Sequence, residues 1–494
     1  MDIGRVLFPA LRWDDDRGYG ADSAAVREAL DLGVGGFILF GGRADAARAL
    51  ADRLERDAGR PLLLGSDLER GAGQQLAGAT RLPPLAAIGF LDDEEVARRA
   101  GELTGREAVA AGVPWVYAPM ADVDLEPLNP IVGTRAFGTD PDRVASLVVA
   151  WIEGCRSTGA LACAKHFPGH GRTTTDSHLE LPRVDVGEAA LDVDLVPFRA
   201  AISAGVDSMM TAHVAYPALD ASGSPATLSA PIVTGLLRDR LGFRGVAVTD
   251  ALIMEGVHGD EGVSGGEPAA AVRALAAGCD ALLYPDDAPA VAAGIRSALD
   301  DGRLSDARVL EAISRVEAMT ARAAAAQRPG RGGWGSADDA RWALETATRA
   351  VHMVRGERPR LGEDVTVATV DDDLGGAYPP PSRDVFPERL RAAGRRVRAS
   401  GGDPATASAP DDDHSGPLLI AVYADIRAWK GRPGLSPAAI DAVARLSGAG
   451  PATVCLFGHP RLAADLRDAP TIVCAWGGEA IMQEAAADWL AGGA

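Results

Sequence analysis

The sequence lacks an even set of cysteines, an excess of positive charge and long apolar runs. Its cysteines are odd in number and lie in apolar surroundings, which indicates buried free thiols in a reducing compartment. No apolar run is long enough for a membrane span, and the N-terminal segment has no basic stretch before an apolar core. We therefore expect a cytoplasmic protein without a signal peptide. The five cysteines are Cys155, Cys163, Cys279, Cys455 and Cys474.

Negative charge dominates the composition. The chain carries 49 basic and 69 acidic residues, a formal net charge of −20. This charge disfavours nucleic acid and anionic membranes as partners and favours solubility. A length of 494 residues with 47% hydrophobic residues suits a globular chain of two domains, one of them large. The composition does not predict an oligomeric state.

The first two thirds of the chain alternate short apolar runs with alanine-rich helical stretches, such as 22–32, 92–111, 269–277 and 305–326. Such alternation predicts an α/β fold, a TIM-like (β/α)8 barrel, with an open doubly wound sheet as the alternative. The eight strand-like runs are Val6–Leu11, Gly36–Phe40, Leu62–Asp67, Trp115–Met120, Ala160–Lys165, Asp207–His213, Gly245–Asp250 and Asp280–Tyr284.

A turn-rich segment then marks a domain boundary. We expect a catalytic barrel over 1–327, a linker over 328–337 and a smaller α/β sandwich with a mainly parallel sheet over 338–494. Predicted strands in the second part are Val365–Val370, Leu418–Tyr423, Thr453–Phe457 and Thr471–Trp476, and predicted helices are 385–393, 437–446 and 481–490. Residues 400–415 are expected to form a flexible loop, and Asp371–Asp373 and Asp411–Asp413 to form solvated turns rather than metal sites. No catalytic group is expected in this part.

The stretch from Ala164 to Pro182 holds three of the eight histidines. One interpretation is a solvated loop. A second is a metal site of His166, His170, Asp176 and His178, although Pro168 and Gly169 break the helical spacing typical of zinc sites. A third is an Asp176–His178 dyad on a mobile loop, because residues two apart in an extended segment point to the same side. The carboxylate then orients the imidazole for proton transfer.

Polar side chains stand at the ends of the predicted strands, and closure of a barrel brings such ends to one mouth. These residues are Asp67, Asp122, Asp124, Lys165, His166, His213, Asp250 and Asp286. Asp250 can be a helix N-cap or a nucleophile, and beside Asp176–His178 a carboxylate nucleophile with an imidazole proton donor forms a coherent pair. Asp67 can hydrogen-bond a polar ligand or cap a helix. Arg135 can bind a ligand oxygen or pair with a surface carboxylate. His213 can contact a ligand or be a buried structural histidine.

The motif Lys165-His-Phe-Pro-Gly-His-Gly171, followed by Asp176-Ser-His178, resembles the signature loop of family 3 glycoside hydrolases of the β-N-acetylglucosaminidase branch. The resemblance covers roughly residues 1 to 325, and the sequence departs from it at Arg70, where the family tends to have glycine. Further segments that match the same family in the same order are 34–40, 129–138, 210–214, 225–229 and 241–250.

The resemblance implies a cofactor-free retaining exo-β-N-acetylglucosaminidase, without a metal, acting on carbohydrate fragments of peptidoglycan or chitin. It implies that Asp250 forms a covalent glycosyl-aspartate and that His178, oriented by Asp176, is the acid/base. The residues that would hold the sugar are Asp67, Arg135, Lys165 and His166, with His213 as a further candidate.

Three other functions stay open. Some relatives transfer the sugar to phosphate, and a neutral imidazole base tolerates that anion, so a phosphorylase or a β-glucosidase of the same family is an alternative. A metal-dependent hydrolase using the histidine cluster belongs to a different class. A sugar-binding protein without catalysis is disfavoured, because simple binding needs no histidine–aspartate dyad beside a strand-end carboxylate.

Overall fold

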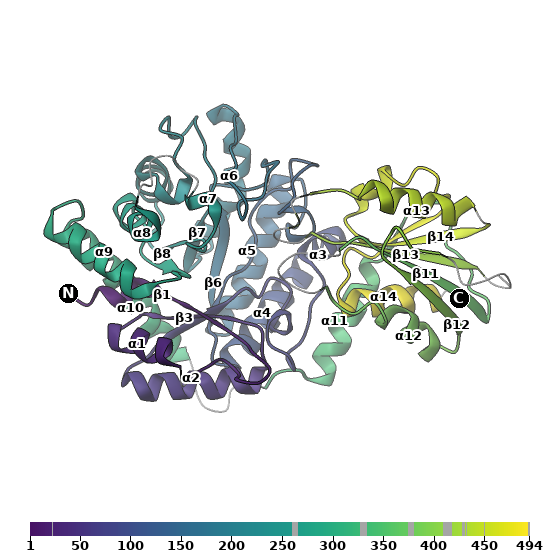
Figure 1. The fold of residues 1–494 in the computed structure, drawn as a ribbon, viewed down its shortest axis with the longest axis horizontal. Helices are drawn as coiled ribbons and strands as arrows, with labels where there is room; N and C mark the ends of the chain where they lie inside the picture. Colours follow the sequence, from purple (N-terminus) through teal and green to yellow (C-terminus); the bar gives the residue numbers. More distant parts are fainter. Residues whose placement is uncertain are drawn as a thin grey trace. The chain divides into compact units, whose positions relative to one another are not determined.

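The computed structural model describes residues 1–21, 23–258, 265–326, 333–373, 380–408, 417–426, 430, 432–448 and 450–492. Residue contacts divide the chain into two compact units (Figure 1). The first comprises Met1–Arg81, Asp93–Leu125 and Gly138–Asp339, and the second comprises Leu82–Asp92, Glu126–Phe137 and Ala340–Ala494. Two short segments that precede and follow barrel strands in the sequence therefore belong to the second unit.

The first unit is a barrel of parallel strands. Its seven-stranded sheet follows chain order, with β2 (Ala10–Arg12), β3 (Gly36–Phe40), β4 (Leu63–Ser66), β5 (Trp115–Val116), β6 (Leu161–Phe167), β7 (Ser208–Thr211) and β8 (Val246–Thr249). A parallel bridge between Val248 and Ala281 joins β8 to the start of β9 (Leu282–Leu283), and β9 pairs with β1 (Leu7–Phe8). Because β1 and β2 are successive parts of one run, the ring closes, and the predicted barrel is confirmed over the open sheet.

The first predicted strand, Val6–Leu11, is wrong in one respect, since the structure divides it into β1 and β2 at Pro9. Proline has no backbone N–H and cannot donate to a strand ladder. The carbonyl of Pro9 still accepts from the Ile38 N–H at 3.0 Å, so the connection to β3 survives the break.

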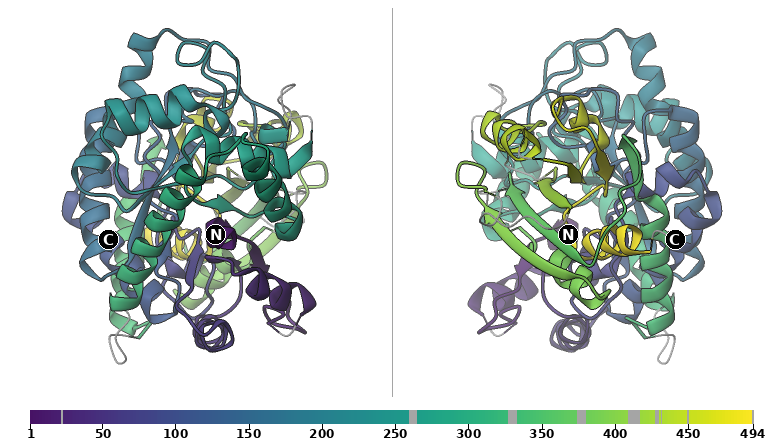
Figure 2. Two further views of the ribbon diagram at one scale, coloured as in Figure 1. Left: turned by 90° about the vertical axis from the view of Figure 1, so that its left-hand side faces the viewer. Right: turned by 90° about the vertical axis from the view of Figure 1, so that its right-hand side faces the viewer.

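Helices surround the ring of strands (Figures 1 and 2). They include α1 (Ala24–Leu32), α2 (Ala44–Ala58), α4 (Glu94–Ala110), α5 (Pro141–Ser157), α6 (Glu188–Ser203), α8 (Gly266–Ala277), α9 (Ala288–Asp300) and α10 (Asp306–Ala326). The Asp93 carboxylate caps α4 by accepting from Glu95 N–H and Val96 N–H, as expected for an N-cap aspartate. Asp92 is not part of α4, because it ends α3 (Leu85–Leu91) with a positive φ of 55°, and Asp22 lies outside the described residues.

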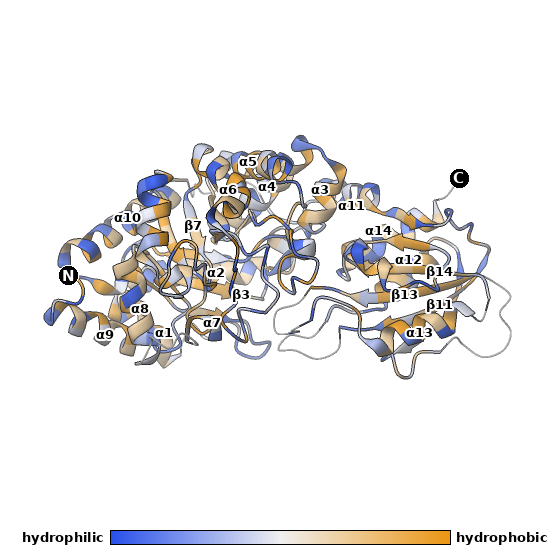
Figure 3. Cartoon of the chain, turned by 90° about the horizontal axis from the view of Figure 1, so that it is seen from above, coloured by the Kyte–Doolittle hydropathy of each residue, from blue (hydrophilic) through white to orange (hydrophobic). Residues whose placement is uncertain are grey.

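Large apolar side chains fill the barrel, which is therefore a packed core and not a pore. Phe8, Trp115, Tyr117, Cys163 and other buried residues form one contiguous cluster. Outer helices such as α9 and α10 show alternating apolar and polar positions (Figure 3). All five cysteines are buried and free, as predicted, and burial raises the pKa of the Cys163 thiol to about 12.

The second unit is an α/β sandwich. Its sheet has the order β10 (His352–Arg355), β15 (Ile472–Cys474), β14 (Ala452–Gly458), β13 (Leu418–Ala424), β11 (Asp364–Asp371) and β12 (Arg396–Gly402), and all pairs are parallel except the edge pair β10–β15. Helix α13 (Pro437–Gly448) covers one face, and α12 (Val385–Ala392) and α14 (Ala480–Ala491) cover the other (Figure 1). The predicted mainly parallel sandwich is confirmed.

Two edge strands of this sheet, β10 and β12, escaped prediction. Residues 400–402 belong to β12, so the predicted loop over 400–415 is wrong at its start, and 409–416 lie outside the described residues. The edge strand β12 has an exposed or half-buried residue at every position, which leaves no apolar run to signal a strand.

No helix within the described ranges is both long enough and apolar enough to cross a bilayer.

Candidate active site

A bulge in β6 presents two consecutive polar residues at the mouth of the barrel. Ala164 pairs with Met209 and Phe167 pairs with Thr211, so β6 has one residue more than β7 over this interval. Consecutive residues of a regular strand point to opposite faces, whereas a bulge redirects a side chain. Lys165 and His166 are thus both buried, and they contact carboxylates that follow β4 and β5, respectively.

Lys165 joins two carboxylates that follow β4. Its Nζ lies 2.6 Å from Asp67 Oδ1 and 2.7 Å from Glu69 Oε1. The Lys165 and Glu69 side chains are 2% and 5% exposed, whereas Asp67 is 30% exposed, so Asp67 is the member that a ligand can reach. Glu69 was not among the predicted site residues. Its signal in the sequence was weak but present, because a buried lysine requires a compensating carboxylate and Glu69 stands two residues after Asp67.

His166 forms a pair with Asp122, which follows β5. The His166 Nδ1–H donates to Asp122 Oδ2 at 2.8 Å, and the His166 backbone N–H donates to the same oxygen at 3.1 Å. The other oxygen, Oδ1, accepts from His170 N–H at 2.5 Å. Burial raises the pKa of Asp122, but the His166 hydrogen bond and the charges of His166 and His170 lower the pKa more, so the carboxylate stays ionised.

The predicted dyad residues Asp176 and His178 lie together with the same geometry. The His178 Nδ1–H donates to Asp176 Oδ1 at 2.7 Å, and the His178 N–H donates to that oxygen at 2.9 Å. The Asp176 side chain is 1% exposed and the His178 ring is 17% exposed, compared with 6% for His166. A buried carboxylate therefore holds a ring that remains accessible, as a proton donor to a substrate must be.

Asp250 follows β8 and accepts from the Ala251 N–H at 2.8 Å through Oδ1. Helix α7 begins only at Glu255, so Asp250 is not its N-cap. Burial raises the pKa of Asp250, but the charges of His166, His213 and His178 and the Ala251 hydrogen bond hold that pKa below its usual value. Asp250 is thus an ionised carboxylate close to three histidines.

The remaining predicted residues have different surroundings. His213 is fully buried, with Nδ1 2.8 Å from Thr227 Oγ1 and Nε2 donating to the Ala251 carbonyl at 3.1 Å. Both ring nitrogens thus contact protein groups. Arg135 belongs to the second unit, where its Nη1 donates to the Ile131 carbonyl at 3.1 Å.

The histidines of the alternative metal site have separate partners. His170 contacts Thr173 Oγ1 and Ser177 Oγ, whereas His166 and His178 each bind their own aspartate. Among the residues that the structure describes, no group of three or more His, Cys, Asp or Glu side chains is arranged to hold a metal ion.

Asp371–Asp373 in the second unit are not solvated turns as predicted, because all three are buried and pair with Arg383, Lys430 and Arg432. Asp411–Asp413 lie outside the described residues.

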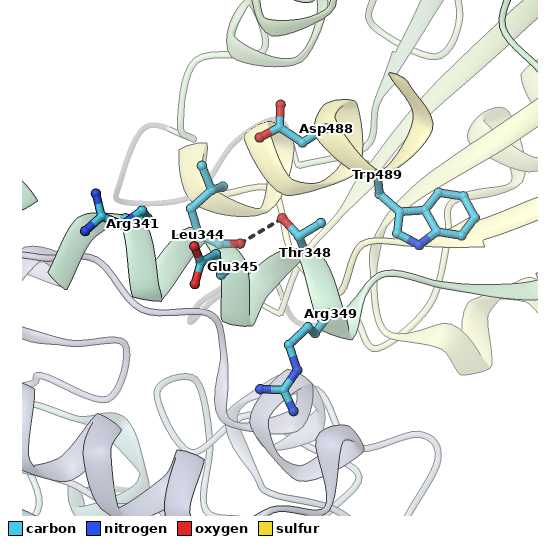
Figure 4. Close-up of a pocket in the computed structure, with 7 residues that line it drawn as sticks. All are labelled: Arg341, Leu344, Glu345, Thr348, Arg349, Asp488 and Trp489. Carbon is cyan, nitrogen blue, oxygen red and sulfur yellow. Dashed lines mark hydrogen bonds between the residues drawn. The ribbon is translucent and has the colours of Figure 1, made fainter. Parts of the chain in front are cut away.

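A pocket of about 590 Å³ in the second unit does not have the character of an active site. Figure 4 shows the charged side chains of Arg341, Arg349 and Asp488 pointing in different directions. Asp488 also pairs with Arg389 at 2.7 Å. The polar groups do not converge on one point, which a binding site for a small polar ligand requires. Its lining residues are Arg341, Leu344, Glu345, Thr348, Arg349, Asp488 and Trp489.

Comparison with known proteins assigns the barrel to a family. Residues 18–319, more than half of the chain, match the glycosyl hydrolase family 3 N-terminal domain. The chain belongs to glycosyl hydrolase family 3. A β-N-acetylglucosaminidase/β-glucosidase of Cellulomonas fimi is 35% identical over 300 residues, 59% of this chain and 52% of that protein. This chain thus spans about half the length of that relative.

Two further proteins are similar to this chain. A β-hexosaminidase of Xylella fastidiosa is 42% identical over 286 residues, which cover 54% of this chain and 82% of that protein. The solved structure of a family 3 β-N-acetylglucosaminidase from Paenibacillus has a TM-score of 0.85 at 27% identity, covering 99% of this chain and 96% of the other. The two-unit architecture is therefore shared with that enzyme along nearly the whole chain.

Proposed function

We propose that this family 3 glycoside hydrolase is a retaining exo-β-N-acetylglucosaminidase that releases terminal β-linked N-acetylglucosamine. The observation that carries the proposal is an ionised Asp250 close to an accessible histidine, His178, whose Nδ1 is held by the buried Asp176. The choice of sugar rests on the relatives, which are named as β-hexosaminidases and β-N-acetylglucosaminidases. Peptidoglycan or chitin fragments in the cytoplasm are the proposed substrates.

The proposed reaction has two steps. Asp250 attacks the anomeric carbon while His178, protonated at Nε2, gives its proton to the glycosidic oxygen, so the aglycone departs as an alcohol and a glycosyl ester forms. The now neutral His178 then takes a proton from water, whose oxygen attacks the anomeric carbon and displaces Asp250. Two inversions give net retention. Asp176 uses Nδ1 of the ring, which directs proton transfer to Nε2.

Neighbouring groups have supporting roles in the proposal. Asp67, supported by Lys165 and Glu69, and His166, oriented by Asp122, would hold the sugar hydroxyls. The proposed contact of Arg135 with the sugar rests on the family resemblance. His213 is better suited to positioning than to binding, because its Nε2 donates to the carbonyl of Ala251, directly after the nucleophile.

A β-glucosidase or a phosphorylase with the same residues is the second candidate. The Cellulomonas fimi relative is named for both sugars. A histidine base also becomes neutral after giving up its proton, whereas a carboxylic acid becomes an anion that repels phosphate. The residues of the site therefore fit either acceptor.

The deciding experiment measures release of an aryl leaving group from matched β-N-acetylglucosaminide and β-glucoside, each with and without phosphate. We expect faster cleavage of the acetamido sugar at a rate independent of phosphate. Sugar 1-phosphate as product would instead establish a phosphorylase. The Asp250→Asn variant keeps the shape of the side chain but is a poor nucleophile, and we expect its rate to fall at least about 1,000-fold. A near-normal rate in that variant would refute the nucleophile assignment.

A further inference from the structure

Residues 168–178 follow β6 and form the histidine loop, whose first half, residues 168–173, is tied firmly to the barrel. The Tyr216 hydroxyl donates to the Gly169 carbonyl at 2.7 Å, and Asp122 accepts from His170 N–H at 2.5 Å. Gly171 packs so closely on the Val123 carbonyl that a Cβ there would lie 1.7 Å from its oxygen. Arg172 donates to the buried Asp194 of α6 at 2.7 Å. This half thus has little freedom to move relative to the strand ends.

The second half carries the Asp176–His178 dyad and bends away from that anchored part. Thr174 is exposed and Thr175 half-buried, and the chain returns to the interior at Asp176 and Ser177. Ser177 then makes two contacts. Its carbonyl accepts from Gly256 N–H at 3.0 Å, and its Oγ lies 3.1 Å from His170 Nε2. The His170–Ser177 contact therefore links the anchored half to the residue between the two members of the dyad.

The neutral ring of His170 bridges two hydroxyl groups. Burial and the charge of His166 lower the pKa of His170 to about 4, so its ring is neutral near pH 7, with one N–H and one lone pair. Nδ1 lies 2.8 Å from Thr173 Oγ1, and Nε2 lies 3.1 Å from Ser177 Oγ. A hydroxyl can donate or accept, so in either tautomer the ring can hydrogen-bond to Ser177.

We propose that His170 and Ser177 are positioning residues of the acid/base: their hydrogen bond fixes Asp176 and His178 relative to the anchored half of the loop. This inference rests on the proposed function of His178. His170 itself does not move protons in the reaction, since its Nδ1 contacts Thr173 Oγ1 and its Nε2 contacts Ser177 Oγ. Proton transfer requires the donor within hydrogen-bond reach of the leaving oxygen, and a misplacement of about 1 Å can cost on the order of 100-fold in rate.

The test compares Ser177→Ala with Ser177→Thr, which restores the hydroxyl, over aryl glycosides that differ in leaving-group pKa. The series uses whichever sugar the wild type cleaves, so that an error in the proposed sugar does not remove the test. Ser208→Ala is the matched control, because Ser208 is a buried β7 serine whose Oγ accepts from Trp115 Nε1 at 2.8 Å. Hydrogen exchange of peptides covering 176–180 is measured on the same proteins.

We expect Ser177→Ala to lose kcat/KM about 10-fold or more on poor leaving groups and less than about twofold on activated ones, because only the former need the general acid. Ser177→Thr should recover most of the loss. Exchange over 176–180 should accelerate in Ser177→Ala and not in Ser208→Ala. Equal losses on all leaving groups, or unchanged exchange over 176–180, would overturn the inference. Hydrogen exchange does not require turnover. It therefore still tests whether the His170–Ser177 hydrogen bond orders residues 176–180 if the proposed function is wrong.

Discussion

Two buried residues, His170 in the anchored loop and Asp194 of α6 beside it, titrate in opposite senses. Burial lowers the pKa of His170 to about 4, and burial raises the pKa of Asp194 to about 6 against the opposing effect of Arg172. A lowered pKa in the folded state gives stability that is lost as the pH falls, whereas a raised pKa gives stability that is lost as the pH rises. Between about pH 4 and pH 6 the two residues therefore act against each other.

Asp194→Asn isolates the second of these effects. The Asp194 carboxyl contributes stability to the wild type that is lost as the pH rises from 3.8, its ordinary pKa, through about 6, and the variant lacks this contribution. The free energy of unfolding of the variant minus that of the wild type should therefore increase with pH over this range, by up to about 3 kcal/mol. Urea unfolding at several pH values measures the difference. Asp192→Asn, which changes an exposed carboxylate on the same helix, controls for charge, and a difference that does not vary with pH would contradict the prediction.

At the scale of elements, the two ends of the barrel strands have different roles, one in stability and the other in the chemistry of the site. Asp280 precedes β9 and is fully buried, with Arg238, Arg308 and Arg315 donating to it. The N-terminal ends of barrel strands serve stability, whereas the C-terminal ends carry the chemistry. The ion cluster around Asp280 is thus a structural feature that joins α10 to the base of the barrel.

Asp280→Ala should be strongly destabilising, by about 3 to 5 kcal/mol, because it leaves the buried Arg238 without its carboxylate. Urea unfolding of the variant and the wild type gives the difference. Asp301→Ala is the matched control, since Asp301 pairs with Arg303 on the surface, and its loss should stay below about 1 kcal/mol. Similar losses of unfolding free energy in the two variants would show that burial does not determine how much the Asp280 ion cluster contributes to stability.

At the scale of the whole molecule, two segments from the first third of the sequence pack with the second unit. The Phe90 ring stacks on His352 at 4.1 Å, and Arg461 Nη1 donates to the Glu126 carbonyl at 3.3 Å. A Cβ on Gly133 would lie 2.3 Å from the Ile426 side chain.

Along the sequence, we propose that the catalytic part spans residues 1–327, that residues 328–337 form a linker and that the second part spans residues 338–494. Residues 327–332 lie outside the described residues.

A chain truncated after residue 339 should therefore be poorly folded. It retains Leu82–Asp92 and Glu126–Phe137 without the rest of the unit to which they belong, and Leu85, Ile88, Ile131 and Val132 are buried in the full chain. Loss of their cover should expose apolar surface and promote association. Size-exclusion chromatography and binding of a hydrophobic dye, compared with the full chain, provide the measurement. A monomeric truncated chain that binds no more dye would contradict the prediction.

The sequence alone determined the barrel, the sandwich and the Asp176–His178 pair, because these depend on patterns and contacts between residues close in the chain. Only the tertiary structure paired His166 with Asp122, 44 residues away, and Lys165 with Glu69. It also gave both ring nitrogens of His213 protein partners and placed Arg135 in the second unit. Such contacts join strand ends and loops that are far apart in the sequence and come together only when the barrel closes. The local sequence pattern therefore does not predict them. The edge strands β10 and β12 escaped prediction for a related reason: their pairing comes from a neighbouring strand, whereas their own residues lack an apolar run.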